Sequence, residues 1–147
     1  MRIATGLLIA LLLSLASAYA DTVKVVYDLT TGDSKKIEKH LISSLEAVAK
    51  YYKDEQKELK IMVVISGNAY KYFINDLKAS PYKDDKDAIE VQEQFRHRLQ
   101  QLNDVFGVTF NMCATGMKAR KIDKNTLYNY VHAEVMKSVY LIYIHLE

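Results

Sequence analysis

The amino-acid sequence predicts a single α/β domain, with a mostly parallel sheet of four or five strands and helices on both faces. Short β-branched stretches alternate with long amphipathic stretches along the chain, which is the pattern of strands joined by helical crossovers. One short stretch, residues 59–66, is almost continuously apolar, as expected of a strand covered on both faces of a parallel sheet. The crossovers are expected to be right-handed.

The first half of the domain is expected to form a strand, a long helix and a second strand. Residues 22–28 are β-branched and are followed by a turn-like run at residues 30–33, which predicts the first strand. Residues 34–53 carry apolar side chains at spacings of three and four, which predicts one face of an amphipathic helix. These side chains are Ile37, Leu41, Leu45, Val48 and Tyr52. The apolar strand at 59–66 follows.

The middle of the chain predicts a short helix, a loop and a second long helix. The short helix is expected over residues 69–77, and the polar segment 78–87, which contains the single proline, predicts a surface loop. Residues 88–106 form the second amphipathic pattern, and Gly107 is suited to end that helix. The apolar stripe of this helix consists of Val91, Phe95, Leu99, Leu102 and Phe106.

The last part predicts two more strands. The third strand is expected over residues 108–113, and its side chains should point alternately to the two helix layers. One set, Val108, Phe110 and Met112, should face one layer. The other set, Thr109, Asn111 and Cys113, should face the opposite layer. Short helices are expected at 115–121 and 124–129, the second capped by Asp123. A fourth strand at 130–135 and a helix from about Ser138 complete a flavodoxin-like three-layer sandwich.

The first 20 residues resemble a secretory signal peptide. They contain one positive charge at Arg2, an apolar run, and the small-residue ending Ala18-Tyr19-Ala20. We expect cleavage before Asp21, export to the bacterial periplasm, and a domain over residues 21–147 that does not contact the membrane. The alternative is an uncleaved anchor helix, since the apolar run is close to the minimum length that spans a bilayer.

Charge and cysteine content narrow the function classes. Lys and Arg number 20 and Asp and Glu 18, so the chain lacks the basic surplus of a nucleic-acid-binding protein. Cys113 is the only cysteine, so no disulfide forms within the chain. In an exported protein, an unpaired thiol needs a separate explanation.

A site is expected where the strands end. In open parallel sheets, ligands bind beyond the carboxyl ends of the strands. Cys113 ends the third strand and directly precedes a helix start, a position that favours a reactive thiolate. The alternative is that Cys113 is a small buried hydrophobe. Side chains on the neighbouring loops and on the following helix are predicted to line the site. They are Asp28, Thr31, Ser66, Asn68, Thr115, Lys118 and Arg120.

Other candidate chemistry is weaker. His40, His97, His132 and His145 do not have the spacing of metal ligands, so neither a metal nor another cofactor is expected. Nothing singles out a histidine as the partner of a cysteine nucleophile. Two groups of aromatic residues are better explained by packing than by chemistry. The first, Tyr70, Tyr72 and Phe73, is expected to pack in the core or an interface, although it could also wall the crevice near the cysteine. The second, at the C-terminus, predicts a subunit interface and consists of Tyr128, Tyr130, Tyr140 and Tyr143.

The chain resembles the DsrE/DsrF-like family of small α/β sulfur-relay proteins. The segment "GVTFNMCATGMKARKID" carries the resemblance, supported by "VKVVYDLTTGD" near the start and "AEVMKSVYLIYIHL" at the end. The resemblance implies that Cys113 carries sulfane sulfur as a persulfide and exchanges it with donor or acceptor proteins. It also implies a homotrimer or homohexamer. Many relatives have a glycine where this chain has Lys121, so the turn at that position is expected to differ.

Overall fold

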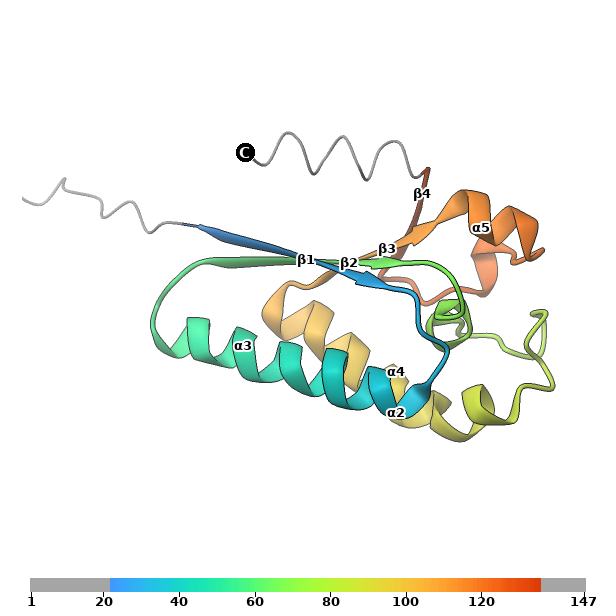
Figure 1. Ribbon diagram of the computed structural model, residues 1–147, viewed down its shortest axis with the longest axis horizontal. Coiled ribbons are helices and arrows are strands. Elements are labelled where there is room, and N and C mark those ends of the chain that lie inside the picture. The colour runs from blue at the N-terminus through green and yellow to red at the C-terminus, as the bar shows by residue number, and fades with distance from the viewer. Residues whose placement is uncertain (1–21, 136–147) are drawn as a thin grey trace, which may run out of the picture.

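Residues 22–135 are described by a computed structural model. Four parallel strands form one sheet in the order β1-β2-β3-β4, so strands that follow one another in sequence are neighbours in space (Figure 1). The strands are β1 (Val23–Leu29), β2 (Leu59–Ile65), β3 (Thr109–Cys113) and β4 (Val131–Glu134). The predicted single α/β domain with a parallel sheet is confirmed.

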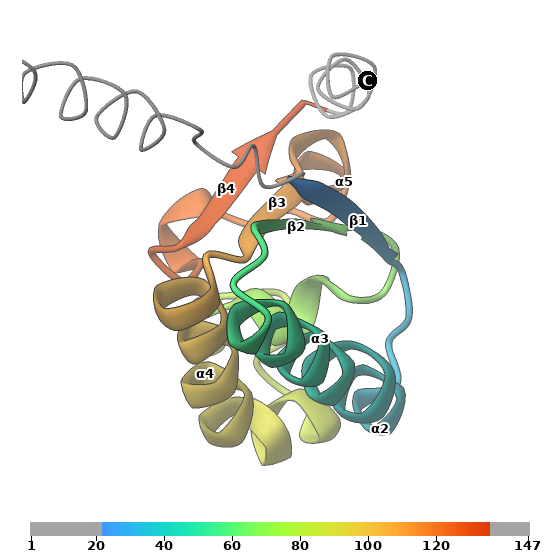
Figure 2. The same ribbon diagram turned by 90° about the vertical axis from the view of Figure 1, so that its left-hand side faces the viewer.

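The long helices lie on one face of this sheet. The first crossover runs through α2 (Ser34–Lys36), the π-helical segment η2 (Ile37–Ile42) and α3 (Ser43–Asp54), and the second contains α4 (Lys86–Phe106). Figures 1 and 2 show α3 and α4 side by side along one face, whereas α5 (Ala114–Ala119) lies at the carboxyl end of β3, away from them. The helix predicted from about Ser138 and the predicted signal peptide lie outside the described residues.

All four strands end at the same edge of the sheet. Leu29 of β1 is opposite Ile65 of β2, Ile65 is opposite Met112 of β3, and Cys113 is opposite Glu134 of β4. The loops that follow β1, β2 and β3 therefore meet at one end of the molecule, where parallel sheets place their ligand sites.

Alternate residues of β3 face opposite sides, as predicted. The ring of Phe110 packs against Phe73, with 5.5 Å between the ring centroids, on the side of the core. The amide Nδ2 of Asn111 lies 3.5 Å from Sδ of Met62 on the other face. Cys113 shares that second face because it is two residues further along the strand.

The first long helix buries only part of the predicted stripe. Ile37, Leu41 and Leu45 are buried as predicted, and Ile42 and Ala49 are buried in addition. The predicted members further along, Val48 and Tyr52, are only half-buried. The π-helical segment η2 contains Ile37, Leu41 and Ile42, and its i→i+5 hydrogen bonds shift the phase of the residues that follow it by one position.

Two predicted short helices are shorter than expected. Instead of a helix over 69–77, there is a 3-10 helix, η3 (Tyr70–Phe73), and instead of one over 124–129 there is η4 (Lys124–Thr126). The reason is tertiary: Ile74 and Leu127 form an antiparallel bridge, and the Asn75 backbone N–H donates to the Thr126 carbonyl at 2.7 Å. These hydrogen bonds compete with continued helix.

The second long helix has the expected ends. Asp85 caps its start by accepting a hydrogen bond from the Ala88 backbone N–H at 2.9 Å, and Gly107 ends it in the left-handed conformation at φ 66°. The helix begins two positions before residue 88, inside the predicted loop. No helix within residues 22–135 is long and apolar enough to cross a membrane.

Candidate functional site

The loops after β1 and β2 pack tightly against each other. The backbone N–H of Asn68 donates to the Thr30 carbonyl at 2.8 Å. A Cβ atom on Gly67, whose φ is 59°, would lie 2.7 Å from that carbonyl oxygen, and a Cβ atom on Gly32 would lie 2.8 Å from Cβ of Asn68. Glycine is therefore required at both positions for the two loops to meet.

Cys113 lies at the junction of β3 and α5. It is the last residue of the strand and the N-cap residue of α5, and its side chain makes no capping hydrogen bond. The residue is 7% exposed and belongs to the hydrophobic core cluster. It is therefore placed at the site-forming edge, as the sequence predicted, but it is largely covered.

Tyr70 connects the loop after β2 to this junction. Its ring is buried, and its hydroxyl donates a hydrogen bond to the carbonyl oxygen of Cys113 at 3.2 Å. Any side chain at position 116 would overlap that hydroxyl, so Gly116 of α5 admits the close approach of Tyr70. Burial raises the pKa of Tyr70, and the nearby Cys113 side chain raises it further.

Arg120 lies against the ring of Tyr70. Its guanidinium carbon is 4.9 Å from the centroid of the Tyr70 ring, which is a cation–π distance. The same guanidinium is beside the side chain of Tyr82. Burial raises the pKa of Tyr82, although the positive charge of Arg120 opposes this rise.

Next to Tyr82 the surface is hollowed. The hollow has a volume of about 400 Å³ and lies at the ends of β1 and β2. It is open and polar, so it would suit a small hydrophilic group. Its walls are Thr31, Gly32, Asp33, Asn68, Lys71, Tyr82 and Asp85.

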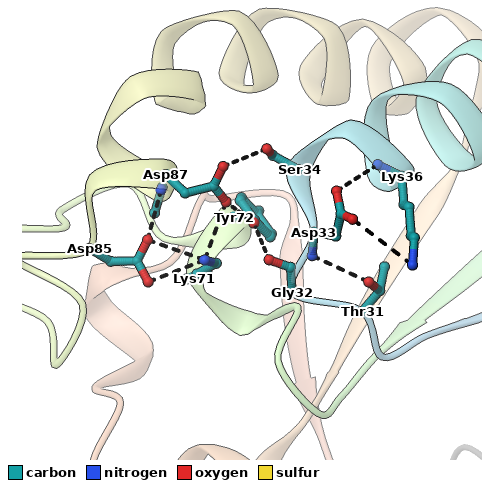
Figure 3. A network of polar contacts seen from close by, with 10 residues as sticks. Thr31, Gly32, Asp33, Ser34, Lys36, Lys71, Tyr72, Asp85 and Asp87 are labelled. Carbon is teal, nitrogen blue, oxygen red and sulfur yellow. Dashed lines mark hydrogen bonds and ion pairs between the residues drawn. The ribbon is translucent and has the colours of Figure 1, made fainter.

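A network of polar contacts supports one wall of this hollow (Figure 3). The Nζ atom of Lys71 lies 3.1 Å from both carboxylate oxygens of Asp85 and 3.3 Å from Asp87. The Tyr72 hydroxyl lies between the Asp87 carboxylate and the Gly32 carbonyl, which is 2.6 Å away, and the Ser34 hydroxyl donates to Asp87 at 2.5 Å. The network thus joins the loop after β1, η3 and the start of α4.

Charge and burial act in opposite directions on this network. The Lys71 side chain is 12% exposed, and burial lowers its pKa, but contacts with Tyr72, Asp85 and Asp87 outweigh burial and raise it. For Asp87, burial raises the pKa, but hydrogen bonds from Ser34, Tyr72 and Lys71 bring it below its usual range. Burial and the Asp87 carboxylate raise the pKa of Tyr72 to about 12. Lys71 and Asp87 are therefore held in their charged forms.

The structure brings together only some of the predicted lining residues. Thr31 and Asn68 line the hollow, and Arg120 lies beside Tyr82, which is one of its walls. Ser66 is half-buried in the loop after β2 and donates its backbone N–H to the Leu29 carbonyl at 2.9 Å. The others are exposed and separate from the hollow: Asp28 on the sheet, and Thr115 and Lys118 on α5.

Six residues of this region were not among the predicted lining residues: Tyr70 beside Cys113, and Gly32, Asp33, Lys71, Tyr82 and Asp85 in the walls of the hollow. The sequence favours packing for Tyr70, which its burial supports, but its hydroxyl also reaches Cys113. Lys71 and Tyr82 fall in segments predicted as a short helix and a surface loop. A tyrosine-rich stretch directly after a central strand was the available signal, and it pointed only to the general region.

Histidines contribute no metal site in the described part of the chain. No group of three His, Cys, Asp or Glu side chains within residues 22–135 could hold a metal ion. His97 pairs with Glu93 at 3.0 Å on the surface of α4, His132 is exposed on β4, and His145 lies outside the described residues.

Fold and site together define a small α/β protein whose one cysteine ends an inner strand of a parallel sheet, beside a buried tyrosine. The chain belongs to the DsrE/DsrF-like family, whose model matches residues 17–144. Membership suggests a role in sulfur relay.

Comparison with solved structures supports the fold. A protein of unknown function from Methanobacterium thermoautotrophicum is similar, with a TM-score of 0.59, 16% sequence identity, and coverage of 84% of this chain and 92% of that one. At this identity the likeness bears on the fold alone. No curated protein matches the sequence.

Proposed function

We propose that this protein relays sulfane sulfur as a persulfide on Cys113, in the bacterial periplasm. The observation that carries the proposal is the position of Cys113 at the carboxyl end of β3, where its carbonyl is held by the Tyr70 hydroxyl. Family membership supports it. An unpaired thiol also suits a carrier, because a second nearby cysteine would convert the persulfide into a disulfide.

The transfer step needs no external oxidant. The Cys113 thiolate attacks the outer sulfur of a donor persulfide, a new S–S bond forms at Sγ, and the S–S bond of the donor breaks. The donor leaves as a thiolate with the electron pair of the broken bond. Release to an acceptor is the same exchange in the opposite direction.

Because Cys113 is 7% exposed, loading requires a local opening of its surroundings. The short helix α5 is a suitable element to move, since Cys113 caps its start and Tyr70 packs on its Gly116. Opening would separate α5 from Tyr70 and uncover Sγ.

Mass spectrometry of the intact protein tests the proposal. After incubation with a persulfide donor, the wild-type chain should gain the mass of one sulfur atom, and Cys113→Ser should gain none. The matched control is Cys113→Ser combined with Thr115→Cys, which moves the thiol to an exposed position on α5. The thiol of this control needs no opening, so it gives the loading of an exposed thiol at the same helix. No gain of sulfur in wild type, or an equal gain in Cys113→Ser, would contradict a carrier role.

The burial of Cys113 favours one alternative, a non-catalytic ligand-binding or assembly module in which the cysteine is a packing residue. Thiol labelling of the native protein separates the two functions. A carrier should be modified faster than the protein unfolds globally, because only a local opening is needed. A packing cysteine should react only at the rate of unfolding. In that case sulfur loading should be absent from wild type as it is from Cys113→Ala.

The proposed location rests on residues 1–20, whose composition suits a cleaved signal peptide. N-terminal sequencing of the protein isolated from its own cells provides the test. The mature chain should begin at Asp21 and be found in the periplasmic fraction. A chain that still begins at Met1 in the membrane fraction would indicate an anchor instead.

A further inference from the structure

Arg120 differs from the other arginines in the described part of the chain. Arg96 pairs with Glu93 at 3.7 Å, and Arg98 binds Glu38 and Glu46. Within residues 22–135, no carboxylate forms an ion pair with Arg120. Among the described residues, no carboxylate therefore neutralises the positive charge of the Arg120 guanidinium.

The position of Arg120 is nevertheless well defined. Its backbone N–H is shared between the carbonyls of Gly116 and Met117, each at 3.1 Å, which ties it to the last turn of α5. Its guanidinium lies over the Tyr70 ring and beside Tyr82, and the residue is half-buried. Aromatic rings stabilise a cation without neutralising it, and a guanidinium has five N–H donors, more than a tyrosine hydroxyl can accept.

Arg120 and Cys113 are neighbours of the same side chain. The Tyr70 ring carries the guanidinium on its face, while its hydroxyl binds the carbonyl of Cys113. Tyr82, the other neighbour of Arg120, lines the open hollow at the ends of β1 and β2. The carboxylates of Asp33 and Asp85 also border that hollow, and both are already paired, Asp33 with Lys36 at 3.9 Å and Asp85 with Lys71, which Asp87 shares. A cation with unused donors thus lies against the tyrosine that holds the thiol-bearing junction and beside the tyrosine that lines the open hollow.

We propose that Arg120 binds the anionic group of the sulfur donor, so that the substrates are small anionic sulfane-sulfur compounds. The proposal rests on the sulfur-relay function proposed above and names its substrate class. Planar guanidinium donors match the oxygen atoms of such anions. A thiolate and an anionic donor repel each other, and a cation close to both lowers that repulsion.

The transfer from thiosulfate, the simplest compound of this class, illustrates the balance of the step. The Cys113 thiolate attacks the outer sulfur of thiosulfate, an S–S bond forms at Sγ, and the S–S bond of thiosulfate breaks. Sulfite leaves with the electron pair, and Cys113 holds the persulfide. The guanidinium of Arg120 would hold the oxygen atoms that depart as sulfite.

Binding is tested separately from transfer. Titration calorimetry with thiosulfate in low-chloride buffer should detect binding to Cys113→Ser, which lacks the nucleophile. Adding Arg120→Gln should weaken that binding about tenfold or more, because charge-assisted hydrogen bonds are lost. Adding Arg120→Lys should restore part of the affinity. The control is Lys83→Gln, which removes an equal charge from an exposed residue adjacent to Tyr82 and should leave affinity unchanged.

Sulfur loading of wild type and of Arg120→Gln, both of which keep Cys113, completes the experiment. If thiosulfate binds through Arg120 but Cys113 never gains sulfur from any donor, the relay function fails and anion recognition stands. If Cys113 gains sulfur and Arg120→Gln changes neither thiosulfate affinity nor loading, the substrate class is wrong and the relay function stands. Absence of thiosulfate binding to Cys113→Ser would also overturn the role of Arg120.

Discussion

At the scale of single residues, the contact between Gly116 and Tyr70 controls how α5 follows β3. A Cβ atom at position 116 would overlap the Tyr70 hydroxyl and lie 2.8 Å from its Cζ atom. Tyr70 is 1% exposed, so neighbouring atoms enclose its ring. The absence of a side chain at Gly116 therefore lets the hydroxyl reach the Cys113 carbonyl.

We expect Gly116→Ala to lower the free energy of unfolding by about 1–3 kcal/mol, because the added methyl group overpacks the junction. Tyr70→Phe alone should cost ~1 kcal/mol through loss of its hydrogen bond. The double variant should cost less than the sum, since Phe lacks the atom that clashes most severely. Urea unfolding measures all three. Strict additivity would show that the two residues do not interact as described.

Lys121 carries backbone strain that glycine would relieve. Its φ is 56°, in the left-handed region, and the turn is closed by a hydrogen bond from the Ile122 backbone N–H to the Met117 carbonyl at 3.0 Å. Although the turn was expected to differ where relatives have glycine, the lysine takes the conformation for which glycine is best suited.

Replacing the lysine should therefore stabilise the protein. We expect Lys121→Gly to raise the free energy of unfolding by about 1 kcal/mol, because left-handed backbone is unfavourable for residues with a Cβ atom. The control is Lys118→Gly, in the helical part of α5, which should lower it by about 1 kcal/mol. Thermal or urea unfolding distinguishes the two signs, and a loss of stability in both variants would rule out strain at Lys121.

At the scale of elements, the Lys71 network holds the start of α4 against η3 and the loop after β1. We expect Lys71→Met to lower the free energy of unfolding by about 1–3 kcal/mol, because it leaves two carboxylates without their shared cation. Lys50→Met is the control: its ion pair with Asp54 is exposed and should contribute less than ~0.5 kcal/mol. Equal effects in urea unfolding would mean that the network is no stronger than a surface pair.

The same network predicts a pH dependence. The pKa of Asp87 is lowered in the folded state, so its contribution is present above its ordinary value of 3.8 and is lost as the pH falls below it. The pKa values of Lys71 and Tyr72 are raised, so their contributions are lost only at alkaline pH, for Tyr72 between 10 and about 12.

Urea midpoints of wild type and Asp87→Asn should therefore differ at about pH 6 and begin to converge once the pH falls below 3.8, because the unfolded chain then binds a proton at Asp87 that the folded protein still excludes. Below that value the wild-type midpoint should fall more steeply with decreasing pH. A difference that stays constant over the whole range would show that the charge of Asp87 does not stabilise the fold.

The first long helix shows the limit of periodicity as a guide. Spacings of three and four correctly predict a helix that begins at Ser34, and Ile37 and Leu41 are buried in it. They do not reveal the π-helical segment, because Ile42 beside Leu41 fits either phase. Packing against the sheet and α4 selects the phase that buries Ile42 and Ala49.

At the scale of the whole molecule, the apolar C-terminal segment is expected to mediate assembly. Residues 139–144 are too apolar for a fully solvated helix, and we propose that they form the interface of a homotrimer or homohexamer. Sedimentation should give the mass of such an oligomer for wild type. Tyr140→Glu combined with Tyr143→Glu should lower it, because charges are unfavourable in an apolar interface.

A surface tyrosine provides the control for assembly. Tyr51 is exposed on α3, so Tyr51→Glu should leave the oligomer intact. A monomeric wild type would contradict the proposed assembly. Circular dichroism of the double variant checks that its subunits are still folded, so that a change in mass reports on the interface.

The sequence alone was sufficient to predict the α/β class, the four strands and the position of Cys113 at the carboxyl edge, because alternation, apolar runs and caps are local signals. Tertiary structure decided which side chains meet there. Tyr70, Gly116 and Arg120 come together only when η3 and α5 pack beside β3, and the short elements end where Ile74 pairs with Leu127. Contacts between residues far apart in the chain depend on packing, which local patterns do not encode.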